Sequence, residues 1–204
     1  MTNSNSVAAF LLAGGSSSRM GRDKALLEIS GVPLLLHAAR LVQPLVADLT
    51  VIGPAAAYLH LGLRVLPDDR PGVGPLGGIA TALRVSSIPW NLVVGCDLPY
   101  LNGLFLEFLI HRALGSKADA LLPDSAGGPE PLCAMYNRRC LPTMEAAIER
   151  GDFKVTNALS GCAVELISEA QWKEFDSGGR LFKNMNSPAD YQEAREFFEG
   201  KSAR

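Results

Sequence analysis

The sequence predicts an α/β protein, a single Rossmann-like domain of three α/β/α layers built on a mostly parallel sheet. Short apolar runs typical of buried strands alternate with segments of helical periodicity, which is the pattern of βαβ units. Polar, glycine-rich segments follow several of these runs, and in a parallel sheet such loops gather at one edge. The 204 residues contain no long linker, so we expect one domain over 1–204.

Strands and helices alternate regularly in the first half of the chain. The apolar run Val7–Leu12 predicts the first strand, and Pro33 suits the first position of the helix that follows. Trp90–Gly95 is the most apolar strand and ends at Cys96-Asp97. The other elements expected here are strands at 48–53 and 64–66 and helices at 33–41, 76–85 and 101–114.

The alternation loosens in the second half. We expect strands at 118–122, 163–167 and 182–185, an extended segment at 129–136, and helices at 142–150 and 188–199.

Composition and charge argue against several classes of protein. The formal net charge of −2 leaves no basic surplus for a nucleic-acid backbone. No apolar run is long enough to span a bilayer, and the first residues lack the pattern of a signal peptide. The cysteines lack C-x-x-C spacing, which predicts neither a zinc site nor a disulfide framework. We therefore expect a cytoplasmic protein that binds neither nucleic acid nor membrane.

The loop after the first strand indicates a phosphate site. Gly14 and Gly15 let backbone N–H groups approach an anion, and Arg19 and Lys24 add positive charge. A glycine loop that gathers cations after a buried strand favours a polyphosphate ligand. It has neither the Gly-Lys-Ser/Thr ending of a Walker A loop nor the G-x-G-x-x-G spacing. The alternative is a flexible polar turn.

Asp97 follows the most apolar strand directly. A carboxylate at a strand tip is a plausible ligand for Mg²⁺, which takes one or two protein carboxylates and completes its shell with water and phosphate oxygens. The alternative is that Asp97 caps the helix expected near Leu101.

A second polar loop begins at Asp68. Its carboxylate could accept the N1–H and exocyclic amine of guanine, and Gly77 and Gly78 could let a flat base approach the backbone. The alternative for Asp68 is a turn residue. His37, His60 and His111 lie away from these loops, so nucleophilic side-chain catalysis is not expected.

Several motifs, taken together, resemble one known family. They are Leu12-Ala13-Gly14-Gly15-x-Ser17-x-Arg19-Met20-Gly21-x-Asp23-Lys24-Ala25, Gly74-Pro75-Leu76-Gly77-Gly78, Cys96-Asp97-Leu98-Pro99, Pro129-Glu130-Pro131-Leu132-Cys133-Ala134-x-Tyr136 and Asn184-x-Asn186-Ser187-Pro188-x-Asp190. This combination closely resembles the molybdenum cofactor guanylyltransferases, which are nucleotidyltransferases. The resemblance extends from about Val7 to Tyr191.

The resemblance implies a function. Members of this family transfer GMP from GTP to the molybdopterin cofactor that carries molybdenum, with Mg²⁺, and release pyrophosphate. It implies a nucleotidyltransferase fold with a nucleotide-binding half at about 1–110 and an acceptor-binding half at about 111–195. It also allows transient contact with cofactor-insertion proteins or apoenzymes.

The resemblance also implies roles for residues. Lys24, Arg19 and Asp97 would be catalytic, and Asp97 would hold the metal. Gly53 stands where the family has an asparagine, so the asparagine's interaction with the nucleotide is either missing here or made by backbone. The nucleotide-binding set is Leu12, Ala13, Gly14, Gly15, Lys24, Gly53, Asp68, Gly77, Gly78 and Asp97, and the acceptor-binding set is Pro131, Tyr136, Asn184 and Asn186.

For the acceptor side the residues themselves add one argument. Asn184 and Asn186 would point to the same face of a strand, and their amides suit the edges of a pterin ring. The alternative is that they cap the final helix, although Ser187 is already placed to do so.

Other functions remain open. A cytidylyltransferase for the same cofactor, or another small-molecule nucleotidyltransferase, would differ in base choice. A non-catalytic cofactor-delivery protein is less favoured, because binding alone seldom needs both Lys24 and Asp97. A sugar-nucleotide glycosyltransferase would need an Asp-x-Asp motif, which Asp97-Leu98-Pro99 does not supply.

Overall fold

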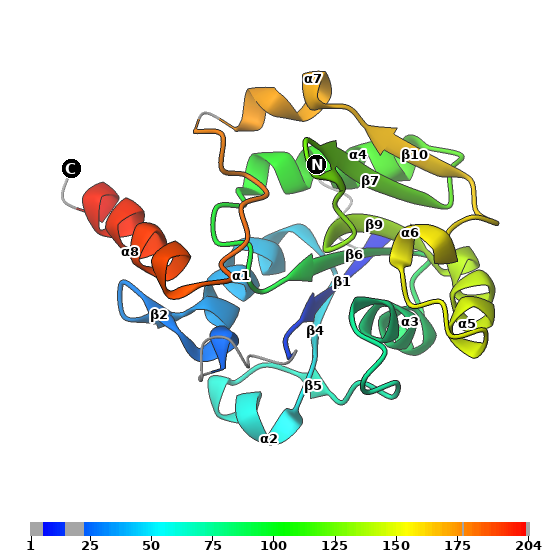
Figure 1. The fold of residues 1–204 in the computed structure, drawn as a ribbon, viewed down its shortest axis with the longest axis horizontal. Coiled ribbons are helices and arrows are strands. Elements are labelled where there is room, and N and C mark those ends of the chain that lie inside the picture. The colour runs from blue at the N-terminus through cyan, green and yellow to red at the C-terminus, as the bar shows by residue number, and fades with distance from the viewer. Residues whose placement is uncertain (1–5, 15–22, 177, 203–204) are drawn as a thin grey trace.

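A mixed, mostly parallel β-sheet forms the middle layer of the molecule (Figure 1). The computed structural model describes residues 6–14, 23–176 and 178–202, and within them the sheet has eight strands. Their order is β10-β7-β9-β6-β1-β4-β5, with β8 paired to β7. The strands are β1 (Val7–Leu12), β4 (Asp48–Ile52), β5 (Val65–Leu66), β6 (Trp90–Gly95), β7 (Ala120–Ser125), β8 (Gly128–Pro129), β9 (Cys133–Asn137) and β10 (Val164–Ile167).

The most apolar strands occupy the centre of the sheet. β1 lies between β4 and β6 and is parallel to both, with Leu11 opposite Val51 on one side and Val94 on the other. Every residue of β6 is buried. Continuous apolar runs suit these positions because helices cover both faces of a parallel sheet.

Strands β8 and β9 depart from the parallel order. β9 pairs antiparallel with β6 on one side and with β7 on the other, and β8 pairs antiparallel with β7. The extended segment expected at 129–136 therefore contains two strands, β8 and β9. Because β9 pairs with β6, the two halves of the chain share one sheet.

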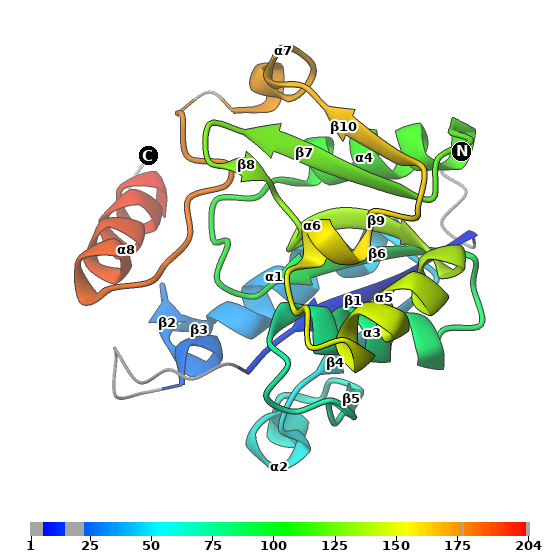
Figure 2. The same cartoon turned by 45° about the vertical axis from the view of Figure 1, so that its right-hand side comes forward.

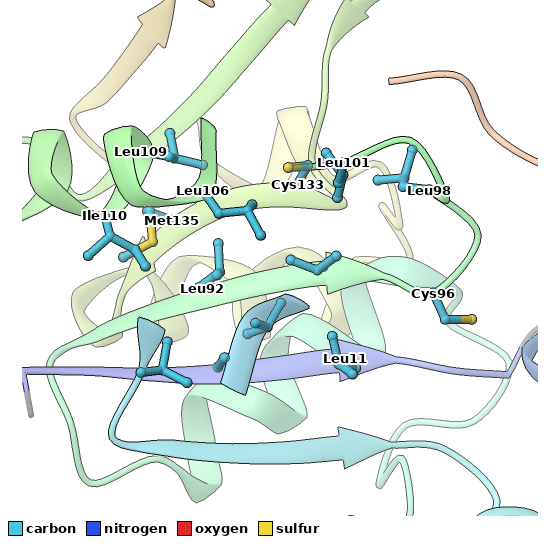
Figure 3. Packing of buried hydrophobic residues seen from close by; sticks show 14 of the residues in the cluster. Leu11, Leu92, Cys96, Leu98, Leu101, Leu106, Leu109, Ile110, Cys133 and Met135 are labelled. Atoms are coloured by element: carbon cyan, nitrogen blue, oxygen red, sulfur yellow. The ribbon is translucent and has the colours of Figure 1, made fainter. Parts of the chain in front are cut away.

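Helices cover both faces of the sheet. On one face lie α1 (Leu34–Val42) and α4 (Gly103–Gly115), and on the other α3 (Pro75–Val85), α5 (Leu141–Glu149) and α6 (Val155–Ala158) (Figure 2). Neighbouring residues of one strand point to opposite faces, so Leu121 and Leu122 belong to different buried clusters. Figure 3 shows the first cluster, in which Leu106 and Leu109 of α4 pack above Leu92 and Met135.

The C-terminal segment returns to the first half of the molecule. Beyond α7 (Glu169–Trp172) the chain leads to α8 (Pro188–Ser202), which packs beside the small hairpin of β2 (Glu28–Ile29) and β3 (Val32–Pro33) (Figures 1 and 2). Met185 is buried in the cluster that joins α8 to this hairpin. None of the described helices is both long enough and apolar enough to cross a membrane.

Three expectations about these elements were wrong. Residues 182–185 form no strand, and Met185 is held instead by its N–H, which donates to the carbonyl of Asp97 at 2.9 Å. Pro33 pairs with Glu28 in the hairpin and precedes α1 rather than beginning it. α4 begins at Gly103, two residues after the expected start, because the Asn102 side chain caps it by accepting from the N–H of Phe105 at 3.0 Å.

Candidate functional site

A cleft of about 1050 Å³ lies at the sheet edge where β1, β4, β5 and β6 end. These strands are parallel, so the loops that follow them meet there. Most of the expected nucleotide-binding residues line this cleft, namely Leu12, Ala13, Gly14, Lys24, Gly53, Asp68, Gly78 and Asp97. The expected residues Gly15 and Arg19 lie outside the described residues.

Asp97 sits at the tip of β6, in the wall of the cleft. Its side chain is 23% exposed. Burial raises the pKa of its carboxyl, and the nearby charge of Lys24 lowers it. Asn102, and not Asp97, caps α4, so the capping role considered for Asp97 is wrong.

Lys24 also lines the cleft, next to Asp97. Its Nζ lies 4.0 Å from Asp97 Oδ2 and donates to Asn186 Oδ1 at 2.7 Å. The side chain is 21% exposed, so the ammonium is partly shielded yet open to a ligand. The cation and the carboxylate expected to act together are therefore neighbours.

Backbone lines the floor of the cleft between β1 and β4. The N–H of Ala13 donates to the carbonyl of Ile52 at 2.9 Å. A Cβ at Gly53 would lie 2.1 Å from the carbonyl oxygen of Ala13, so no side chain fits at position 53. Any ligand contact at Gly53 must therefore come from its backbone, which was one of the two outcomes expected there.

Asp68 lines the cleft and is held by neighbours. Its Oδ1 accepts from the N–H of Arg70 at 2.9 Å and lies 2.9 Å from the hydroxyl of the buried Thr81. Thr81 also contacts Asp69, which pairs with Arg84. Asp68 thus combines the turn role with a position in the cleft wall, and its support by Thr81 depends on a contact that forms only in the folded chain.

Gly77 does not line the cleft. It is buried in α3, and a Cβ there would lie 2.7 Å from the carbonyl oxygen of Arg70. Its small size lets α3 pack against the loop that follows Asp68. Gly77 is therefore explained by packing, whereas Gly78, the next residue, lines the cleft.

The expected acceptor residues divide into two groups. Asn186 accepts a hydrogen bond from Lys24, which lines the cleft. Asn184 is half-buried in the same segment. Ser187, with Asp190, caps α8, so the asparagines are not needed for that role. Because residues 182–185 form no strand, a shared strand face for the two asparagines is also corrected.

Pro131 and Tyr136 belong to the segment around β9. Tyr136 is fully buried, so the structure corrects the expectation that it contacts a ligand directly. Its hydroxyl donates to the carbonyl of Pro131 at 2.8 Å and so holds Pro131 in place. Leu132, the residue after Pro131, lines the cleft.

Comparison with known proteins identifies the family. Residues 9–163 match the model of the MobA-like NTP transferase domain. The chain belongs to this family. A probable molybdenum cofactor guanylyltransferase of Carboxydothermus hydrogenoformans is 32% identical, over 92% of this chain and 94% of that protein. A molybdenum cofactor guanylyltransferase of Pseudomonas aeruginosa is 36% identical, over 87% of this chain and 89% of that protein.

Solved structures of this family and its neighbours share the fold. The molybdopterin-guanine dinucleotide biosynthesis protein A of Archaeoglobus fulgidus superposes with a TM-score of 0.83 at 26% identity, covering 95% of this chain and 99% of that one. A cytidylyltransferase of Thermus thermophilus, at 17% identity and a TM-score of 0.65, shows likeness of fold alone. The expected α/β/α nucleotidyltransferase fold is confirmed.

In this MobA-like transferase, the donor set suits a metal shared with substrate. No group of three or more His, Cys, Asp or Glu that could hold a metal occurs in the part of the chain that the structure describes. Asp97 instead offers one carboxylate to the cleft at the tip of β6, and Mg²⁺ commonly takes one or two protein carboxylates together with phosphate oxygens. The residues present therefore fit a divalent cation that arrives with a nucleotide.

The cleft does not contain an activated nucleophile among its described residues. Burial, together with the charges of Asp97 and Asp23, raises the pKa of the Cys96 thiol to about 12, so the thiol stays protonated. What the MobA-like site offers is fixed positive charge, a metal ligand and close backbone. These features suit a group transfer between two substrates in which one of the substrates, and not the protein, supplies the nucleophile.

Two lining residues were missed as functional candidates. Tyr58, at the end of α2 (Ala55–Tyr58), donates its hydroxyl to Asp23 Oδ2 at 2.7 Å. Asp23 belongs to the motif quoted above, although no role was assigned to it. The signal for Tyr58 was a lone aromatic residue in an alanine-rich stretch just after a strand, which is too weak to interpret alone.

Proposed function

We propose that this chain transfers GMP from GTP to the molybdopterin cofactor that carries molybdenum. The products are the guanine dinucleotide cofactor and pyrophosphate. The proposal is carried by the convergence of Lys24 and Asp97 on one cleft, in a chain whose relatives are named molybdenum cofactor guanylyltransferases.

In this reaction an oxygen of the terminal phosphate of the pterin attacks the α-phosphorus of GTP. The bond between that phosphorus and the bridging oxygen to the β-phosphate breaks, and pyrophosphate leaves with the electron pair. The attacking phosphate is already anionic at neutral pH, so no general base is required. The barrier is chiefly the approach of two anions, which fixed positive charge and positioning lower.

The residues would divide this work as follows. Lys24 would hold the phosphates, Asp68 would face the base, and the backbone at Ala13, Gly14 and Gly53 would lie against the nucleotide. Asp97 would hold Mg²⁺, which when bound supplies charge to the triphosphate. Gly15 and Arg19 keep their proposed roles, nucleotide binding and catalysis, although they lie outside the described residues.

The acceptor would lie on the side of Pro131, Asn184 and Asn186. Asn186 is the best supported of these, because it already contacts Lys24. Tyr136 would act through Pro131, whose carbonyl it holds. We also propose that the protein works in the cytoplasm, where its four free thiols would stay reduced, with transient contact to insertion proteins or apoenzymes.

The test is incubation with Mg²⁺, molybdenum cofactor and each of the four nucleoside triphosphates separately. Mass spectrometry of the pterin product then identifies the nucleotide attached. We expect GMP attachment with GTP, and pyrophosphate released in equal amount. Attachment of CMP would indicate a cytidylyltransferase, and tight binding of cofactor without any attachment would indicate a delivery protein.

A further inference from the structure

Tyr58 and Asp23 form a hydrogen-bonded pair in the wall of the cleft. They are 35 positions apart in the sequence, and the Tyr58 hydroxyl donates to Asp23 Oδ2 at 2.7 Å. Both residues line the cleft, and Tyr58 has almost no surface of its own exposed. The proposed function so far gives this pair no task.

Asp23 has both carboxylate oxygens engaged. Oδ2 accepts from Tyr58, and Oδ1 accepts from the N–H of Ala25 at 3.0 Å. The second bond caps the short 3₁₀ turn Lys24–Leu26, whose end is closed by the N–H of Leu27 donating to the carbonyl of Lys24 at 3.0 Å. The backbone from which the Lys24 side chain extends is therefore fixed through Asp23.

Tyr58 is itself fixed by the core. It ends α2, which follows Gly53 and Pro54 directly at the end of β4. A Cβ at Gly53 would lie 3.0 Å from the Tyr58 ring, so the ring packs closely against that backbone. Burial raises the pKa of the Tyr58 phenol and the bond to Asp23 raises it further, so the hydroxyl stays a donor.

We propose that Tyr58 is a positioning residue for Lys24. Its hydroxyl holds Asp23, and Asp23 holds the turn that directs the Lys24 ammonium into the cleft. The inference rests on the proposed function, because that function places Lys24 on the phosphates of GTP. In this proposal Tyr58 acts through Asp23 and needs no contact of its own with either substrate.

The geometry of Lys24 shows why such support matters. A lysine carries its charge on a flexible four-carbon stem, so the charge is well placed only if its base is fixed and its tip is guided. Asn186 guides the tip at 2.7 Å, and the Tyr58–Asp23 pair fixes the base. A displacement of about 1 Å at a reacting centre can cost about 10²-fold in rate.

The first test is Tyr58→Phe, which keeps the ring and removes only the hydroxyl. We expect kcat for GMP transfer to fall by about tenfold or more, with the KM for the acceptor unchanged. The matched control is Tyr191→Phe, because the Tyr191 hydroxyl donates to the Glu28 carbonyl at the same 2.7 Å but does not line the cleft. That variant should keep the wild-type kcat.

The second test asks whether Tyr58 acts through Asp23. In an Asp23→Ala background, the change Tyr58→Phe should cause no further loss of kcat. The melting temperature of each variant is measured alongside, so that a loss of kcat is read only from folded protein. Equal fold-losses in both backgrounds would show that the Tyr58 hydroxyl acts independently of Asp23, and would overturn the proposal.

The outcomes separate this inference from the proposed function. A wild-type enzyme that attaches no GMP refutes the proposed function, whatever Tyr58 does. Wild-type turnover together with full kcat in Tyr58→Phe refutes only the positioning role. Titration of GTP by calorimetry, without acceptor, gives a readout independent of turnover, and there Tyr58→Phe should weaken binding while Tyr191→Phe does not.

Discussion

Asp97 is a partly buried carboxylate whose charge is only partly compensated by its neighbours. Burial raises its pKa above the ordinary value, and Lys24 at 4.0 Å lowers it. Because the pKa is raised on folding, the contribution of Asp97 to stability is fully present below the unfolded-state pKa of about 3.9 and is lost as the pH rises through the folded-state value. Ionisation of Asp97 in the metal-free protein therefore costs stability.

We predict opposite effects of Asp97→Asn on activity and on stability. GMP transfer should be nearly abolished even at saturating Mg²⁺, because the metal loses the carboxylate proposed to hold it. The melting temperature of the metal-free variant at pH 7 should exceed that of the wild type, and the difference should narrow towards pH 4.

Asp48→Asn is the control for this prediction. Asp48 pairs with Arg64 at the surface and lies outside the cleft, so the variant should keep wild-type turnover. Near-normal GMP transfer by Asp97→Asn would contradict the proposal that Asp97 binds the metal. A lower melting temperature at pH 7 would show that the carboxylate stabilises the fold.

The second prediction concerns Lys24. We expect Lys24→Ala to lower kcat/KM for GTP by about 10²-fold or more, as for other charged contacts to a transferring group. Lys24→Arg should restore only part of this, because a planar guanidinium does not replace a compact ammonium. Steady-state kinetics with varied GTP measure both. Lys117→Ala, an exposed change before β7, serves as the control, and a loss of only a few-fold in Lys24→Ala would contradict the phosphate role.

The site residues that were predictable from the sequence share a local signal. Lys24 and Asp97 follow apolar strands within short motifs, so strand ends and charge were enough to select them. Tyr58 and Thr81 could not be found this way, because their partners lie 35 and 13 positions away and only the fold brings them together. Tyr136 was assigned to the ligand by its motif, although its position in a buried strand predicts core packing.

At the level of elements, long apolar runs were predictable and short elements were not. β1 and β6 have the expected limits, whereas α2, α6 and α7 each span four residues, too few for a helical period to be visible. The segment 182–185 has apolar residues at both ends, yet the N–H of Met185 donates to the carbonyl of Asp97 and not to a strand. Tertiary placement, which sequence alone does not contain, decided its structure.

The third prediction separates the two asparagines of this segment. Asn186→Ala removes the side-chain oxygen that accepts a hydrogen bond from Lys24. This variant should lower kcat with GTP and also weaken binding of the pterin. Asn184→Ala should weaken only the binding of the pterin, since no hydrogen bond in the described part of the chain links Asn184 to Lys24. Calorimetry with each substrate, combined with turnover, measures the two effects. Unchanged GTP kinetics in Asn186→Ala would show that its contact with Lys24 carries no function.

At the level of the whole molecule, the two halves share one sheet and should unfold together. β6 from the first half pairs with β9 from the second along the whole of β9. We therefore predict a single transition in calorimetry, with equal calorimetric and van't Hoff enthalpies. Two resolved transitions would mean that the nucleotide-binding and acceptor-binding halves are separate cooperative units.

Ligand binding should raise the temperature of this transition. GTP with Mg²⁺ at about 100 times its dissociation constant adds about 2.7 kcal/mol to the stability, which for a chain of this length is a rise of roughly 5–10 °C. CTP at the same concentration should give a clearly smaller rise. Equal rises with both nucleotides would contradict the proposed choice of guanine.

The hydrogen bonds from the C-terminal segment to the cleft also determine when the site can be completed during synthesis on the ribosome. Met185 and Asn186 complete the surroundings of Asp97 and Lys24, and the bond between Asn186 and Lys24 spans 162 positions. A nascent chain can therefore build the central strands well before it can finish this cleft. Translation that stops short of Asn186 would release a product with its nucleotide loop but without this support, so catalytic competence should appear only with the last part of the chain.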